Sequence, residues 1–140
     1  MLKAATPYTL HQFDVEHQIL YTSALRDTAP FVATDYFKEL DTVHMCLMKY
    51  NPRYWLVDFR LQLVYFSPLE VTKHTPRWKL ILQDTVLERV AIIADNNNND
   101  SVNYANQVVL ELSHLNDSLP IDIQYGRFIL KQDAMKWLLG

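Results

Sequence analysis

The strongest constraint on the fold is that two kinds of apolar pattern alternate along this chain. Short apolar runs of strand length alternate with longer stretches in which apolar residues recur every three or four positions, which is the period of a helix. Strands joined by helices lie parallel with right-handed crossovers, so the alternation predicts an open α/β sheet. A chain of 140 residues has the usual length of one domain, and we expect a single domain over 1–140.

The N-terminal part begins differently, with two β-prone runs close together. Tyr8–Asp14 and Ile19–Leu25 are separated by a short polar stretch, which is typical of an antiparallel hairpin. An apolar stripe of helical period follows over Tyr36–Tyr50, with Thr34 or Asp35 as its N-cap. Because the hairpin is antiparallel, the expected sheet is mixed.

The remaining elements follow the alternating pattern. Ser67-Pro68-Leu69-Glu70 has the form of a capping box with proline at the first helical position, and Pro76 predicts a break in that helix. Asp100 or Ser101 is expected to cap a later helix, and Gly126 to end the last strand. The further elements are strand Tyr54–Phe59, helix Ser67–Gln83, strand Arg89–Ala94, helix Val102–Leu115, strand Ile121–Tyr125 and helix Gln132–Leu139. The pattern predicts about five strands and about four helices.

Composition excludes several classes of protein. The net charge is −3, with 13 Lys and Arg against 16 Asp and Glu, whereas a nucleic-acid-binding surface needs clustered basic residues. Two glycines are too few for a Walker loop or a dinucleotide-binding turn, and a lone cysteine, Cys46, excludes a disulfide framework. No apolar run approaches the length of a membrane span or a signal peptide, so we expect a cytoplasmic protein.

Catalytic and metal-binding motifs are not recognisable in the sequence. The five histidines include no pair four residues apart, and only His11 and His17, on either side of the expected hairpin turn, could approach each other. A serine nucleophile in a G-x-S-x-G turn is absent. We therefore expect no metal ion, no cofactor and no enzymatic activity.

The candidate site lies at the carboxyl end of the first central strand. Asp58 and Arg60 stand where open α/β sheets bind ligands. Two residues apart on a strand, they point to the same side, and an ion pair that closes the strand end is the alternative interpretation. Asn97, in the polar loop Asp95–Asp100, follows the next strand and is expected at the same edge.

The stretch Leu61–Phe66 is unusually apolar for a loop between a strand and a helix. We expect Val64, Tyr65 and Phe66 to line an apolar pocket or an interface with another chain, and a short extra strand is the alternative. Ser67 then begins the next helix. Its capping box predicts a helix cap rather than a phosphorylation site.

Three sequence stretches resemble one family. They are Trp55–Arg60, close to an hLhDhR strand end; Leu87–Ile93, close to hxRhAhh; and Phe128, Ala134, Trp137 and Leu138, close to FxxxxxAxxWL. Together they are similar to the STAS-like group of small bacterial proteins, related in fold to anti-sigma-factor antagonists and to CRAL-TRIO lipid carriers. The resemblance implies a mixed open sheet and a role in binding a protein or small ligand. The Asp-Ser-Ser-Gly-like segment of the phosphorylated antagonists is absent after Asp58.

These observations predict a non-catalytic binding or regulatory module of the bacterial cytoplasm that acts on a protein partner, with a homodimer as one form. The alternative is a carrier of a small apolar or anionic ligand, or a small enzyme, with a cleft near Asp58 and Arg60. Neither nucleic acid nor a membrane span is expected. The expected contact residues are Asp58, Arg60, Val64, Tyr65, Phe66, Ser67 and Asn97.

Overall fold

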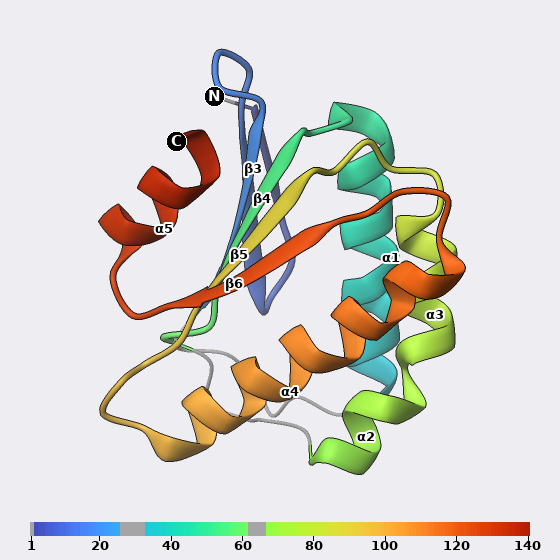
Figure 1. Ribbon diagram of the computed structural model, residues 1–140, viewed down its shortest axis with the longest axis vertical. Coiled ribbons are helices and arrows are strands. Elements are labelled where there is room, and N and C mark those ends of the chain that lie inside the picture. The colour runs from blue at the N-terminus through green and yellow to red at the C-terminus, as the bar shows by residue number, and fades with distance from the viewer. Residues whose placement is uncertain (1, 26–32, 62–66) are drawn as a thin grey trace.

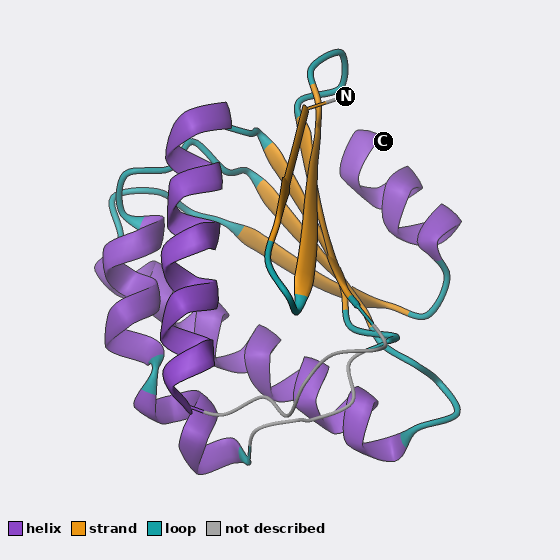
Figure 2. Ribbon diagram, turned by 180° about the vertical axis from the view of Figure 1, so that it is seen from behind, coloured by secondary structure: helices purple, strands orange, loops and turns teal. Residues whose placement is uncertain are grey.

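The computed structural model describes residues 2–25, 33–61 and 67–140, and in them a six-stranded sheet separates four helices on one face from a fifth on the other (Figures 1 and 2). The elements are β1 (Leu2–Ala5), β2 (Thr9–Asp14), β3 (Ile19–Ala24), α1 (Ala33–Tyr50), β4 (Tyr54–Asp58), α2 (Pro68–Lys73), α3 (Thr75–Leu82), β5 (Arg89–Ile93), α4 (Asn99–Leu115), the 3-10 turn η1 (Asn116–Ser118), β6 (Gln124–Phe128) and α5 (Lys131–Leu139). The expected open α/β sheet is confirmed.

The order of the strands in the sheet is the order of the strands in the chain, β1-β2-β3-β4-β5-β6. The first two pairings, β1 with β2 and β2 with β3, are antiparallel. The three that follow are parallel, because a helix joins each strand to the next. The sheet is therefore mixed, as the N-terminal hairpin predicts.

The first strand was not expected from the sequence, and it makes the sheet six-stranded where about five strands were predicted. Leu2–Ala5 contains Lys and Ala, which are depleted in strands, and gives no β signal of its own. It is a strand because the edge of β2 offers unpaired backbone groups, and Ala4 pairs there with His11. Tertiary pairing thus overrides local propensity.

The last strand lies further along the chain than expected, and Gly126 is inside it rather than at its end. The Asn116 side chain accepts from the Ile123 N–H (3.2 Å) and donates to the Ile123 carbonyl (2.7 Å), so the backbone groups of Ile123 are used before the ladder begins. At Gly126 a Cβ would lie 2.8 Å from a ring carbon of Phe128, and glycine permits this close aromatic packing.

Two of the helix boundaries bear on the sequence predictions. Helix α1 begins at Ala33, so Thr34 and Asp35 lie in its first turn and are not its N-cap, contrary to expectation. The break expected at Pro76 is confirmed, because α2 ends at Lys73 and α3 begins at Thr75. A proline cannot continue the upstream hydrogen-bond ladder, which accounts for the restart.

The core consists of two apolar clusters, one on each face of the sheet. The larger lies between the sheet and α1, α3 and α4, and includes Leu20, Leu47, Trp55, Leu82, Val90, Ala105 and the buried Cys46. The smaller lies beneath α5 and includes Ile19, Leu56, Ala91, Ile93, Ala134 and Leu138. Among the described helices, none has both the length and the apolar character needed to cross a bilayer.

Candidate functional site

Asp58 and Arg60 form an ion pair at the carboxyl end of β4. The Arg60 Nη2 lies 2.7 Å from Asp58 Oδ2, and its Nε lies 3.0 Å from Oδ1 and 3.2 Å from Oδ2. The Asp58 Oδ1 also accepts from the backbone N–H of Arg60 at 3.0 Å. The pair therefore closes the end of the strand, the structural role that the sequence leaves open.

The charge of Arg60 is balanced by more than one carboxylate. The hydrogen bond that Arg60 donates to Asp58 raises the pKa of the Arg60 guanidinium, and the charges of Asp58 and Asp95 add to the effect. Asp95 follows β5, which is the parallel neighbour of β4. Two carboxylates are thus close enough to this guanidinium to favour its charged form.

Asn97 lies in a loop whose backbone is held by side chains. Asp95 Oδ1 accepts from the Asn97 N–H (3.0 Å), and Ser101 Oγ accepts from the Asp95 N–H (2.9 Å). The N-cap of α4 is Asn98, which accepts from the N–H groups of Asp100 (3.0 Å) and Ser101 (3.4 Å), so the expected caps Asp100 and Ser101 are wrong. Asn98 has the extended backbone that a cap requires, whereas Asp100 is already helical.

Ser67 is the N-cap of α2, as its sequence motif predicts. Its backbone is extended (φ −64°, ψ 162°), and its Oγ accepts from the Glu70 N–H at 3.3 Å. Pro68 occupies the first turn, where a missing N–H costs nothing. Val64, Tyr65 and Phe66, expected next to this cap, lie outside the described residues.

A second polar cluster is buried between α1 and the first strands, and it was not predicted from the sequence. Trp55 Nε1 donates to Thr22 Oγ1 (2.8 Å), which is 2.8 Å from His11 Nδ1. On the other side of the ring, His11 Nε2 is 3.2 Å from Thr9 Oγ1, and Thr9 donates to Glu39 Oε2 at 2.6 Å. We call these five side chains the polar chain. Four of them are buried, and Thr9 is partly buried.

The polar chain places a titratable ring in the interior. Burial lowers the pKa of His11 from 6.5 to about 4, so the ring is neutral at pH 7. Side chains alternate between the two faces along a strand. Thr9 and His11 therefore point to the same face as the buried Phe13, and Thr22 points to the same face as the buried Leu20. This alternation is the signal that the sequence contains. Recognising the cluster needs the pairing of His11 with Thr22, which is a matter of strand register.

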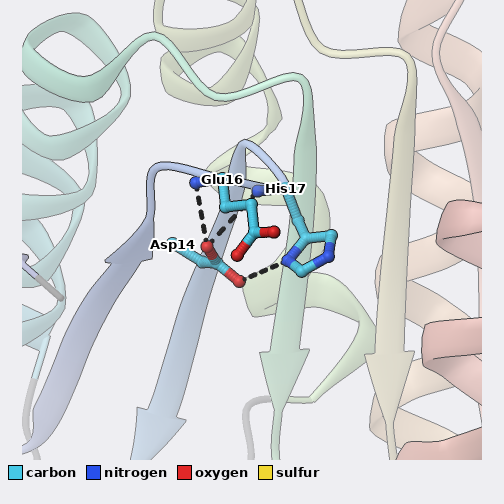
Figure 3. Close-up of side chains that lie close together, drawn as sticks. All are labelled: Asp14, Glu16 and His17. Carbon is cyan, nitrogen blue, oxygen red and sulfur yellow. Dashed lines mark hydrogen bonds and ion pairs between the residues drawn. The ribbon is translucent and has the colours of Figure 1, made fainter.

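The turn between β2 and β3 holds a third cluster, Asp14, Glu16 and His17 (Figure 3). Asp14 accepts from the N–H groups of Glu16 (3.0 Å) and His17 (3.3 Å), and from His17 Nδ1 (2.8 Å). That last contact lowers the pKa of Asp14 and raises that of His17. Ligand atoms of the three residues lie within 4.8 Å of one another, but the hydrogen bonds of the turn account for this grouping.

The structure does not bring His11 and His17 together. His11 is buried in the polar chain, whereas His17 is exposed in the turn and bonded to Asp14. The two-histidine site that the sequence allowed is therefore not formed.

Fold and clusters together define the class: an α/β fold with an ion pair at the carboxyl end of β4 and a buried polar chain. The chain matches no protein-family model, no curated protein and no solved structure. The STAS-like resemblance therefore remains a prediction.

Proposed function

We propose that this chain is a non-catalytic, regulatory protein-binding module of the STAS-like kind, acting in the bacterial cytoplasm, and that its partner docks on α1. The observation that carries the proposal is a line of exposed apolar side chains on this helix. Phe37, Met45 and Met48 are 42%, 67% and 40% exposed. At 100° per residue they fall within an arc of about 80° on α1, beside the buried Leu40 and Leu47.

The composition of this surface suits docking of another chain. Methionine is flexible and adapts to different apolar partners, and Phe37 supplies a rigid anchor. The Arg77 guanidinium from α3 lies 5.8 Å from the centre of the Phe37 ring and pairs with Asp41. An exposed apolar line rimmed by polar residues is typical of a protein interaction site.

The charges next to this line indicate the kind of partner. Lys38 and Lys49 are exposed on the same side of α1, and Arg77 adds a third cation that Asp41 balances. An amphipathic segment with acidic residues beside its apolar face is complementary to this surface. A second copy of the chain would bring the same lysines to the contact, so a different protein with an acidic segment is favoured over the homodimer.

The test compares the wild type, one double variant and one single variant by co-purification from the native cell. Met45→Glu with Met48→Glu adds negative charge to the docking line, and Leu110→Glu, at an exposed apolar position of α4, is the matched control. We expect a partner retained by the wild type and by Leu110→Glu to be lost with the α1 variant, and its binding to weaken with salt. Equal capture by all three proteins would contradict the proposal. Sedimentation of a dimer that the α1 variant dissociates would assign the surface to a second copy.

The alternative, a small-ligand carrier or enzyme at the carboxyl edge, has less support. Asp58 and Arg60 are bonded to each other, and Asp95 adds further negative charge beside the guanidinium. An anionic ligand would have to separate this pair. A thermal-shift screen with small anions checks the alternative, since a ligand in hundredfold excess over its Kd stabilises the fold by about 2.7 kcal/mol.

A further inference from the structure

The polar chain has a definite arrangement of protons, which follows from its two ends. At one end, the Trp55 indole Nε1–H is a donor only. At the other end, Glu39 as a carboxylate is an acceptor only. Thr22, His11 and Thr9 lie between them, each within 3.2 Å of its neighbours in the chain.

The single hydroxyl proton of Thr9 is used on Glu39, at 2.6 Å. Thr9 Oγ1 can therefore only accept from His11, so Nε2 of the ring carries the proton. Thr22 Oγ1 already accepts from Trp55, and its own proton is free to bond to His11 Nδ1 at 2.8 Å. Every donor in the chain then has an acceptor, and His11 is the neutral Nε2–H tautomer.

We propose that the polar chain is a pH-sensitive latch between α1 and the β2–β3 hairpin, closed by neutral His11 and opened when the ring takes a second proton. On the cation, Nδ1–H points at Thr22 Oγ1, so the hydroxyl proton of Thr22 loses its acceptor in the chain. A positive charge is also created at a position with no solvent exposure.

The charged groups around the ring do not reverse this effect. The charged residue of the polar chain on α1 is Glu39. The neighbours on β3 and β4 are the uncharged side chains of Thr22 and Trp55, and β1 places Ala4 opposite His11. Glu39 contacts Thr9 rather than the ring in the described bonds. Burial is the cause that lowers the pKa of His11, to about 4.

The sign of the pH dependence follows. The unfolded chain binds a proton at His11 near pH 6.5 and the folded chain only near pH 4. Stability from this group is therefore complete above pH 6.5 and falls as the pH is lowered from 6.5 to 4. Between pH 7 and pH 5, linkage raises the unfolding constant about twentyfold.

The first experiment is urea unfolding at pH 7 and pH 5 of the wild type and His11→Gln. Gln keeps an N–H donor for Thr9 but cannot titrate. We expect the wild-type unfolding constant to rise about twentyfold more than that of the variant. His17 and His74 also have shifted pKa values, because Asp14 raises the pKa of His17 and burial lowers that of His74. The variants His17→Gln and His74→Gln therefore measure how much of the pH dependence comes from these two rings rather than from His11. Equal pH dependence of wild type and His11→Gln would overturn the latch.

A second experiment uses the wild type alone, so it holds even if His11→Gln does not fold. Nitrogen-15 NMR of the histidine rings is expected to show His11 as the Nε2–H tautomer at pH 7 and still neutral at pH 5. An Nδ1–H tautomer, or a His11 cation at pH 5, overturns the proposal.

Hydrogen exchange separates local opening from global unfolding. After correction for the intrinsic pH dependence of exchange, a latch predicts that α1 and β2 lose protection before β5 as the pH approaches 4. Simultaneous loss in all elements would mean that His11 affects only global stability, and would contradict a latch.

Discussion

The two polar clusters on β4 differ in almost every physical respect, although Trp55 and Asp58 are three residues apart. The Asp58–Arg60 pair is local and open to water, with the Arg60 side chain 40% exposed. The polar chain that starts at Trp55 crosses β3 and β2 to reach α1 and is largely enclosed by the core. A polar contact in water is replaced by hydration when it breaks, whereas a buried one leaves its groups unpaired.

The largest expected effect is that of Thr22→Val. The change keeps the shape but leaves Trp55 Nε1 and His11 Nδ1 without their partner. Burying two unpaired groups costs about 2–5 kcal/mol, to be measured by urea unfolding at pH 7. The control is Thr42→Val on α1, whose exposed hydroxyl donates to the Lys38 carbonyl and which should cost under about 1 kcal/mol. If the two variants lose the same unfolding free energy, the buried polar chain is no more costly to break than an exposed hydrogen bond.

The next effect is that of pH on the polar chain. The shift of the His11 pKa from 6.5 to about 4 corresponds to about 3 kcal/mol, present above pH 6.5 and lost by pH 4. It is measured as the difference in pH dependence between the wild type and His11→Gln. Arg60 should contribute no such slope in this range, because its raised pKa keeps it charged. If Arg60→Ala rather than His11→Gln removes the pH dependence of the unfolding free energy, that dependence does not come from the polar chain.

A smaller effect is expected at Ser67, a local polar contact like the Asp58–Arg60 pair. Ser67→Ala removes the acceptor for the Glu70 N–H and should cost about 1 kcal/mol in thermal or urea unfolding. Ser67→Asp restores an acceptor and should be close to neutral. If Ser67→Asp changes partner binding by more than its effect on stability, or if intact mass from the native cell shows a phosphate, Ser67 is a regulatory site and not only a cap.

The smallest effect is expected for Arg60→Ala. An exposed ion pair contributes about 0–1 kcal/mol, and this contribution should shrink further in 1 M NaCl. Urea unfolding at low and high salt measures both quantities. A loss that matches Thr22→Val and resists salt would show that the edge is more enclosed than its exposure indicates.

The contrast also explains which parts of the site were predictable. The Asp58–Arg60 pair and the Ser67 cap join residues two and three positions apart, so the sequence displays both partners together. In the polar chain, His11 and Thr22 are 11 positions apart, and Thr9 and Glu39 are 30 apart. No local pattern reports such distances, because they depend on strand register and on where α1 crosses the sheet.

The fold followed the same rule. The alternation of strand and helix patterns predicted the α/β class, and Pro76 predicted the break between α2 and α3, since both signals are local. Strand β1 could not be predicted, because its pairing with β2 makes it a strand. The position of Gly126 within β6 could not be predicted either, because it depends on the packing of Phe128. The residues expected at an apolar interface, Val64 to Phe66, lie outside the described residues, so that interpretation stays a prediction.

The agreement between sheet order and chain order has a consequence for synthesis on the ribosome. Each described strand pairs with the one made just before it, so no strand has to wait for a partner from far downstream. Contacts close in sequence form quickly, and domains assemble as the chain emerges. At every stage the growing sheet therefore exposes one new edge, and the next strand to emerge is the one that covers it.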